Sequence, residues 1–242
     1  MKIVISGASG MLGTALSSRL AADGHDVITL VRSRGLSGPG SLYWDPVKGE
    51  IEYDRLNGAD AVIHLAGANI GGGRWTAERK KLILDSRVDG TALLARSLSS
   101  LKQPPGVFLC ASATGYYGHT GDTCVNEDHP AGEGFLAEVC RAWEAAARPA
   151  KDSGIRTVFM RIGIVLDRSG GILEKTLLPF RLGLAGMLGD GSQYMSWITL
   201  KDLVEAFVFV LKTGTVSGAV NVVSPTPVIN RVYTKTLGGV LS

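Results

Sequence analysis

The sequence predicts an α/β protein with a doubly wound parallel sheet and a small C-terminal annex, and two observations carry this prediction. Short apolar runs typical of buried strands recur at residues 2–5, 27–31, 41–44, 61–65, 107–111, 157–162 and 219–223. Helical patterns lie between several of them, at residues 14–22, 76–100 and 134–151. Strands that alternate with helices form βαβ units, which build parallel sheets covered by helices on both faces.

The first βαβ unit carries a glycine turn. Gly7, Gly10 and Gly13 join the strand at residues 2–6 to the helix that follows. Gly7 allows a tight exit from the strand, Gly10 leaves room for a pyrophosphate, and Gly13 lets the helix pack closely. Free N–H groups and the positive end of the helix dipole then face the phosphates. This pattern predicts a Rossmann-like dinucleotide site, which comprises Gly7, Ser9, Gly10, Met11, Leu12 and Gly13. The alternative is a turn with a structural role only.

The end of the second strand indicates which dinucleotide binds. NAD sites usually place an acidic residue there for the ribose 2′-OH, whereas an arginine accommodates the 2′-phosphate of NADP. The chain has Arg32 and Arg34 at this place and no acid. We therefore expect NADP(H) as the cofactor, held in part by Arg32. The alternative is that both arginines are ordinary loop cations.

Composition limits the other classes of function. The sequence is 45% hydrophobic and 19% charged, which is typical of a globular protein, and a net charge of +3 is too small to indicate nucleic-acid binding. Residues 79–81 are basic and are expected to form a solvated helix face. No apolar run reaches the ~20 residues of a membrane span, and no secretory signal is present. We expect a cytoplasmic protein with no nucleic-acid or membrane partner.

Three cysteines, Cys110, Cys124 and Cys140, match no metal-ligand spacing and are odd in number. We therefore expect neither a metal site nor a disulfide framework. The predicted organisation is a dinucleotide-binding domain at residues 1–166 and a small substrate-side region at residues 167–242, with residues 219–223 returning to the main sheet. The chain ends inside a helical pattern, which is consistent with a truncated C-terminus or with a natively short chain.

Several segments together resemble the extended short-chain dehydrogenase/reductase superfamily. Within it the chain is most similar to the atypical sugar-nucleotide epimerase-like group, often labelled epimerase family or cell-division-inhibitor proteins. The matching segments follow the order of the family through nearly the whole chain: residues 7–13, 61–67, 86–91, 111–118, 126–128, 161–165 and 197–202.

The resemblance implies roles for individual residues. It implies that Leu65, Ala66 and Gly67 line the ribose and pyrophosphate of the cofactor, and that Trp44 and Asp45 border the adenine. We also expect Arg161 to be one of the cofactor-binding residues. Ser112 matches the serine that hydrogen-bonds a substrate oxygen, and Tyr117 with Gly118 matches the Tyr-Gly step of the superfamily. For Trp44, as for His64 beside the cofactor strip, a buried core role is the alternative.

The chain departs from the superfamily at the proton relay. The usual acid/base pair is a Tyr followed four residues later by a Lys. In one register these positions hold Leu136 and Cys140, and in a shifted register Phe135 and Val139. Neither register supplies a phenol or an ammonium group.

Hydride transfer to a carbonyl needs a proton donor near the oxygen, and general acid/base help contributes about 10²- to 10⁴-fold in rate. The candidate catalytic residues are Ser112, Tyr116, Tyr117 and Cys140. Glu138, in the same predicted helix as Cys140, is a further candidate acid. Either tyrosine could reach the crevice from the loop after the fifth main strand. Cys140 could equally be a small buried hydrophobe.

Three functions stay open at this point. The first is an NADP(H)-dependent oxidoreductase or epimerase that acts on an unidentified small or nucleotide-linked substrate. The second is a catalytically silent NADPH-binding sensor or regulatory protein, and the third is a scaffold with a vestigial turn. Family members often pair through the helices matching residues 76–100 and 134–151, so a homodimer is also expected.

Overall fold

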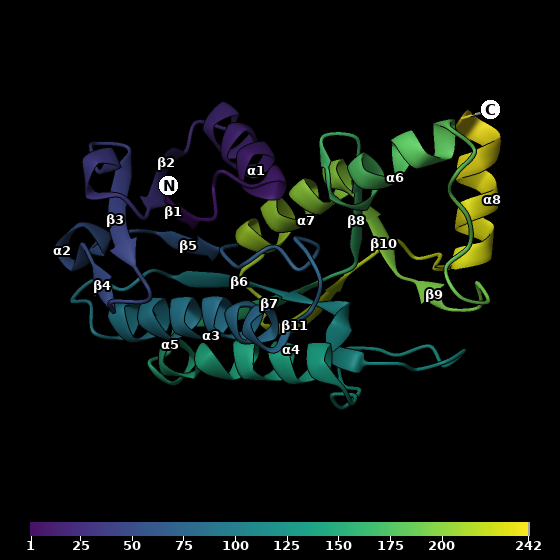
Figure 1. Cartoon of the computed structure of the whole chain (residues 1–242). Coiled ribbons are helices and arrows are strands. Elements are labelled where there is room, and N and C mark those ends of the chain that lie inside the picture. The colour runs from purple at the N-terminus through teal and green to yellow at the C-terminus, as the bar shows by residue number, and fades with distance from the viewer. Residues whose placement is uncertain (242) are drawn as a thin grey trace.

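A computed structural model describes residues 1–241, and its centre is an eight-stranded sheet (Figure 1). The strand order is β11-β7-β6-β5-β1-β2-β3-β4, and every pair is parallel except the antiparallel β3 and β4. The strands are β1 (Lys2–Ser6), β2 (Asp26–Val31), β3 (Ser41–Asp45), β4 (Glu50–Ile51), β5 (Ala61–His64), β6 (Val107–Ala113), β7 (Arg156–Ile162) and β11 (Gly218–Val222). The predicted doubly wound α/β fold is confirmed.

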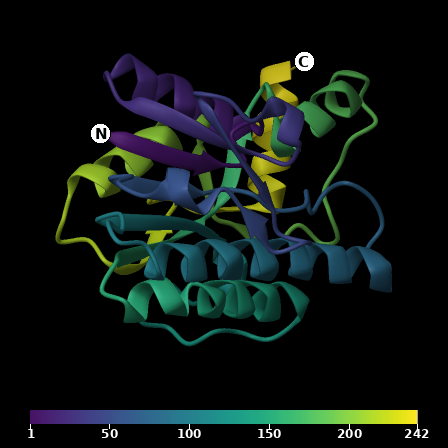
Figure 2. The same ribbon diagram turned by 90° about the vertical axis from the view of Figure 1, so that its left-hand side faces the viewer.

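Helices cover both faces of the sheet and bury a separate hydrophobic cluster on each. Helices α1 (Met11–Ala22) and α7 (Leu200–Lys212) pack on one face, where Leu16, Leu20 and Phe207 are fully buried. Helices α3 (Ala77–Ser99), α4 (Phe135–Ala146) and α5 (Arg148–Asp152) cover the other face. Figures 1 and 2 show α3 and α4 side by side beneath the sheet.

One predicted helix is divided in the structure, and one long helix was not predicted. The expected single helix at residues 134–151 divides at Ala147 into α4 and α5, because Pro149 in the first turn of α5 has no N–H to donate to a preceding carbonyl. Helix α7 was not predicted, although its signal is present: the Thr199 hydroxyl accepts from the Asp202 N–H at 3.1 Å and caps the helix.

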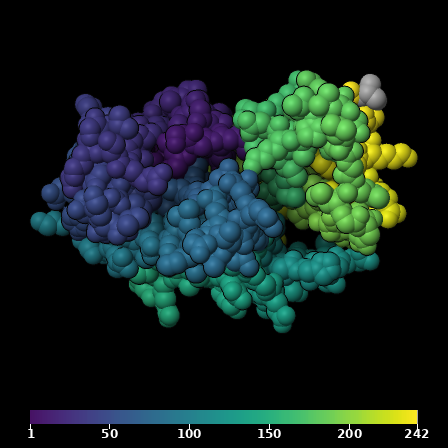
Figure 3. Space-filling view, in the orientation of Figure 1, coloured from purple at the N-terminus to yellow at the C-terminus, as the bar shows by residue number. Residues whose placement is uncertain are grey.

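The annex lies beside the main sheet, at the right of Figure 1. It contains β8 (Ile164–Asp167), α6 (Gly171–Arg181), β9 (Tyr194–Met195), β10 (Trp197–Thr199), β12 (Val228–Ile229) and α8 (Asn230–Leu241). In Figure 3 its green surface borders the purple N-terminal unit and the blue segment that follows β5. Short elements complete the chain, namely η1 (Arg34–Leu36), α2 (Tyr53–Leu56) and η2 (Thr114–Tyr117). Within residues 1–241, no helix combines the length and the apolar character that crossing a membrane requires.

Candidate functional site

Two glycines of the turn after β1 are required by close backbone contacts. Gly7 has φ +72°, and a Cβ on it would lie 2.8 Å from the Ala66 nitrogen. A Cβ on Gly13 would lie 2.1 Å from the Gly7 carbonyl oxygen. Both positions therefore exclude a side chain, and they hold β1, α1 and the segment after β5 together.

Gly10 is different, because protein atoms do not crowd it. A Cβ there would meet only the Gly7 oxygen, at 3.5 Å, and the residue is exposed at the N-cap of α1 without a side-chain cap. Its neighbour Ser9 is also exposed, whereas Leu12 is half-buried. The glycine thus leaves an open approach to the first turn of α1, which fits a phosphate group.

The glycine turn gives a paired prediction. Gly10→Ala should fold with nearly unchanged stability and weaken NADPH binding, because the new methyl group enters the open approach rather than the protein. Gly13→Ala should lose about 1–3 kcal/mol of stability as well, because its methyl overlaps the Gly7 carbonyl. Urea unfolding and a fluorescence titration with NADPH measure the two effects. Equal loss of stability in both variants would contradict this division.

A buried side-chain pair fixes the segment after β5. The Ser6 hydroxyl lies 2.6 Å from Nδ1 of His64, and Ser6 Oγ accepts from the N–H groups of Leu65 at 3.1 Å and Ala66 at 3.3 Å. With two bonds accepted, the hydroxyl proton is directed to His64 Nδ1. Leu65, Ala66 and Gly67, predicted to line the cofactor, are thereby held beside the turn. The sequence reasoning missed Ser6, whose signal is a polar residue directly before Gly7.

His64 itself is a core residue. It is fully buried, lies edge-on to the ring of Trp44 and stacks on Phe108, and its Nε2 has no hydrogen-bond partner. Burial, assisted by the charge of Arg87, lowers the pKa of His64 to about 3. The imidazole is therefore neutral at physiological pH.

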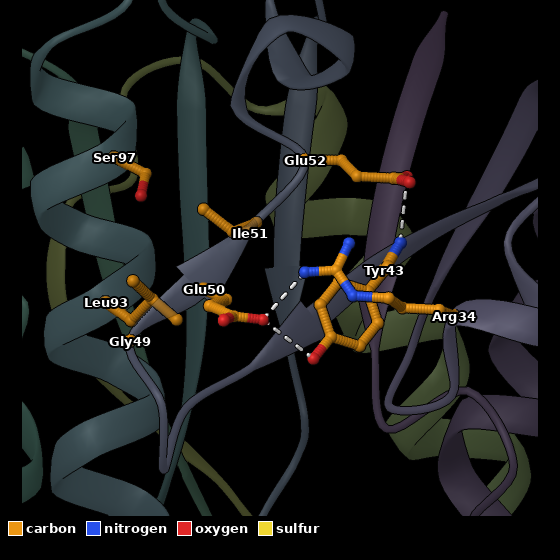
Figure 4. A pocket seen from close by; sticks show the side chains of 8 residues that line it. All are labelled: Arg34, Tyr43, Gly49, Glu50, Ile51, Glu52, Leu93 and Ser97. Atoms are coloured by element: carbon orange, nitrogen blue, oxygen red, sulfur yellow. Dashed lines mark hydrogen bonds and ion pairs between the residues drawn. The ribbon is translucent and has the colours of Figure 1, made fainter.

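Arg32 and Arg34 have different surroundings. Arg32 directly follows β2, is exposed, and makes no hydrogen bond or ion pair within the described part of the chain. Arg34 is bound to Glu50 at 2.8 Å and lies over the Tyr43 ring, 4.1 Å from its centroid (Figure 4). The charge of Arg34 is therefore already paired with Glu50, whereas Arg32 has all of its donors available for a 2′-phosphate.

Asp45 and the carboxylates around the cavity next to β4 already have hydrogen-bond partners in the protein. The Asp45 carboxylate accepts from the N–H groups of Val47 and Lys48 and so closes the turn between β3 and β4. A cavity of about 400 Å³ lies between β4 and α3, and two of its lining side chains are Glu50 and Glu52. Hydrogen bonds from Tyr43, the larger cause, and from Arg34 lower the pKa of Glu50. The charge of this carboxylate is therefore already stabilised by protein groups.

A buried polar network follows the carboxyl end of β6. Arg161 on β7 binds Glu144 of α4 at 2.9 Å through both Nε and Nη2, and its Nη1 donates to the Tyr117 hydroxyl at 2.9 Å. Ser112 donates to Glu144 at 2.7 Å, and Tyr117 donates to Asn221 of β11 at 2.6 Å. Burial opposes the charge of Arg161, but the bonds to Glu144 and Tyr117 outweigh it and raise the guanidinium pKa.

This network decides which candidate proton donors are free. Ser112 and Tyr117 are buried and already bonded within it. Cys140 is buried near Gly115, and burial raises its pKa to about 11. The ring of Tyr116 lies beneath the Arg161 guanidinium, 3.5 Å from centroid to Cζ, while its hydroxyl makes no hydrogen bond in the described chain and is not enclosed.

Arg161 and Met11 occupy places that the sequence did not specify. Arg161 lies at the centre of the network, and its contact with the cofactor stays a prediction. Met11 packs against the annex, since a Cβ on Gly170 would lie 2.9 Å from its Sδ. Sequence reasoning did not select Glu144 or Asn221, and the signal available for Glu144 was an acidic residue near the end of the Ala-rich α4.

The comparisons with known proteins agree with this geometry. The profile of the NAD dependent epimerase/dehydratase family matches residues 3–223. The chain belongs to this family. Among its members, the human epimerase family protein SDR39U1 is 38% identical over 244 residues, which are 100% of this chain and 80% of that protein. The epimerase family protein Mb2239 of Mycobacterium bovis is 41% identical over 236 residues, 98% of this chain and 77% of that one.

Two solved structures of family members resemble the chain closely. A crystal structure of human SDR39U1 isoform 2 with NADPH superimposes with a TM-score of 0.88 at 35% identity, covering 100% of this chain and 80% of that one. A nucleoside-diphosphate sugar epimerase of Corynebacterium glutamicum gives a TM-score of 0.85 at 38% identity, with coverage of 97% and 49%. The predicted resemblance to the epimerase-like group is confirmed.

Proposed function

We propose that this family member is an NADP(H)-dependent oxidoreductase or epimerase and that Tyr116 is its proton donor. One observation carries the choice of residue: of Ser112, Tyr116, Tyr117 and Cys140, Tyr116 is the one whose acidic group is not enclosed and makes no hydrogen bond within residues 1–241. Ser112 and Tyr117 already donate within the buried network, and the Cys140 thiol is enclosed. Tyr116 also belongs to η2, at the carboxyl end of β6, where ligands of open α/β sheets bind.

The cofactor part of the proposal rests on three features. Gly10 opens an approach to the uncapped first turn of α1, and the Ser6–His64 pair holds the neighbouring strip. Arg32, at the end of β2, makes no hydrogen bond or ion pair within residues 1–241 and so has its donors available. The human relative was crystallised with NADPH. When bound, NADPH supplies a hydride for a carbonyl carbon.

The residues of this chain then supply orientation and a proton. The α1 N-terminus binds phosphate, and the strip from Leu65 to Gly67 bounds the site from the side of β5. Tyr116 donates a proton to the carbonyl oxygen as it becomes an alcohol oxygen. The guanidinium of Arg161 holds the Tyr116 ring in place from one face, and Glu144 holds that guanidinium.

The cofactor is tested by comparing NADPH with NADH. A saturating ligand at about 100 times its Kd stabilises a protein by about 2.7 kcal/mol. We expect NADPH to raise the melting temperature at concentrations where NADH has no effect, because Arg32 recognises the 2′-phosphate. A protein whose melting temperature responds to neither nucleotide is inconsistent with the proposal.

Turnover is tested with Tyr116→Phe. NADPH oxidation in single-turnover experiments across a library of carbonyl compounds should identify a substrate, and the variant should react about 10²- to 10⁴-fold more slowly with NADPH affinity retained. Tyr117→Phe is the matched comparison, since it should lower stability through the loss of two hydrogen bonds. If Tyr117→Phe alone slows the reaction, the assignment is wrong. Tight NADPH binding without any oxidation would instead favour a sensor.

The expected homodimer, the cytoplasmic location and the boundary at residue 166 stay predictions. The structure is consistent with pairing through α3 and α4, because these two helices lie side by side and α3 exposes Leu82. Light scattering of the protein in solution measures the molar mass that tests the dimer.

A further inference from the structure

Arg87 on α3 lies against the strip that follows β5. Its Nη1 donates to the carbonyl oxygens of Ala68 at 3.0 Å and Ile83 at 3.1 Å, and its guanidinium lies over the Trp143 ring, 5.0 Å from the centroid. A Cβ on Gly67 would come within 3.2 Å of its Cζ. The guanidinium is therefore fixed in position beside the expected cofactor strip.

This half-buried cation has no counter-ion within residues 1–241. Its hydrogen-bond partners are two carbonyl oxygens, while Nε and Nη2 bond to no protein atom and are not enclosed. Burial lowers the pKa of Arg87, the direction expected for a cation that lacks a negative partner. Arg161, by comparison, has Glu144 at 2.9 Å. A partly desolvated charge with free donors is typical of a site for an anion.

Two further cations hold the same loop. Arg79 of α3 donates to the Asn69 carbonyl and lies against Gly72, where a Cβ would approach its Nη2 at 2.7 Å. Its Nε is buried without a partner, and its charge opposes that of Arg87. Lys175 reaches across from α6 of the annex and donates to the Gly71 carbonyl. Neither side chain pairs with a carboxylate in the described chain.

We propose that Arg87, Arg79 and Lys175 bind an oxyanion of the substrate, a phosphate ester or a carboxylate. This inference rests on the proposed function, since it names the substrate class of the same site. The α1 N-terminus and Arg32 already match the phosphate groups of NADP. The charge of Arg87 instead lowers the pKa of His64, at the end of β5, and that of Cys140, on α4, so Arg87 lies close to both. Lys175 comes from the annex on the substrate side.

Inorganic phosphate is the probe, added to protein saturated with NADPH so that the glycine turn is filled. Phosphate should raise the melting temperature of the wild type, and Arg87→Met should weaken the apparent phosphate affinity roughly tenfold or more, with Arg79→Met following the same direction. Arg87→Lys should keep part of the phosphate affinity, because the positive charge stays but the planar guanidinium with its paired N–H donors is lost. Arg96→Met, an exposed cation on the same helix, is the control and should match the wild type. Each shift is referred to the melting temperature of that variant without phosphate.

Two outcomes overturn the inference. One is a phosphate shift that is absent from the wild type or equal in Arg87→Met. The other is loss of NADPH affinity in Arg87→Met together with competition between phosphate and NADPH, which would assign the anion to the cofactor. Failure of the proposed function gives a different result: the wild type then binds no NADPH, while phosphate still stabilises it through Arg87.

Discussion

Replacing Glu144 with leucine is expected to destabilise the protein by about 3–5 kcal/mol, because it leaves the Arg161 guanidinium buried without its counter-charge. The Arg161 side chain is 5% exposed and that of Glu144 is 12% exposed. Glu144 also accepts the Ser112 hydroxyl hydrogen bond at 2.7 Å, so a second buried group loses its partner. The network joins β6, α4 and β7, and its loss should loosen η2 and Tyr116.

A double-mutant cycle measures this effect. The free energy of unfolding in urea is compared for Glu144→Leu, Arg161→Met and the double variant. The double variant should be more stable than the sum of the two single effects predicts. Each single variant leaves one charge buried without its partner, whereas the double variant buries two apolar side chains and no charge. Asp152→Ala is the control: it breaks an exposed ion pair with Arg148 at 3.4 Å, which should cost at most about 1 kcal/mol. A Glu144→Leu effect no larger than that of Asp152→Ala would refute the prediction.

His64 is expected to make stability fall steeply with acid. Burial lowers its folded pKa to about 3, whereas an unfolded chain binds this proton near pH 6.5. Between these values the unfolded state holds more protons, so stability rises with pH and is lost as the pH falls. The slope is about 1.4 kcal/mol per pH unit, and the total is roughly 4 kcal/mol by pH 3.

His64→Asn separates this contribution from that of the carboxylates. Asparagine cannot titrate but can still accept the Ser6 hydroxyl, so the strip after β5 keeps its main support. Urea unfolding from pH 4.5 to 7 should give the wild type a steeper pH dependence than the variant. Carboxylates with lowered pKa values, such as Glu50 and Glu52, titrate mainly below this window. Parallel curves in the two proteins would show that His64 does not carry the acid sensitivity.

Much of the fold could be predicted because its signals are local. The seven predicted strands correspond to the seven parallel strands of the main sheet, since a buried strand is a continuous apolar run. Five strands of two to four residues were missed, namely β4, β8, β9, β10 and β12, because such short segments carry no periodicity. The break between α4 and α5 was also missed, although Pro149 marks it.

The candidate site was predictable only in part. The glycine turn was predictable, because the positive φ of Gly7 and the contact of Gly13 with the Gly7 carbonyl are local, although the close approach of Ala66 to Gly7 is long-range. The separate environments of Tyr116 and Tyr117 were not predictable, since the Tyr117 hydroxyl bonds to Asn221, 104 residues away, whereas the Tyr116 hydroxyl has no such partner in the described part of the chain. The role of Arg87 was hidden for the same reason: a missing counter-ion is a property of the packed chain.

The sequence by itself thus determined the α/β class, the order of the parallel strands along the chain and the glycine turn. Apolar periodicity and the backbone freedom of glycine are properties of a few consecutive residues, so they can be recognised in the sequence alone. The tertiary structure decided which of two adjacent tyrosines is free, which of two neighbouring arginines is unpaired, and where cations lack a partner. Those outcomes depend on side chains that packing brings together from β6, β7, α3, α4 and the annex.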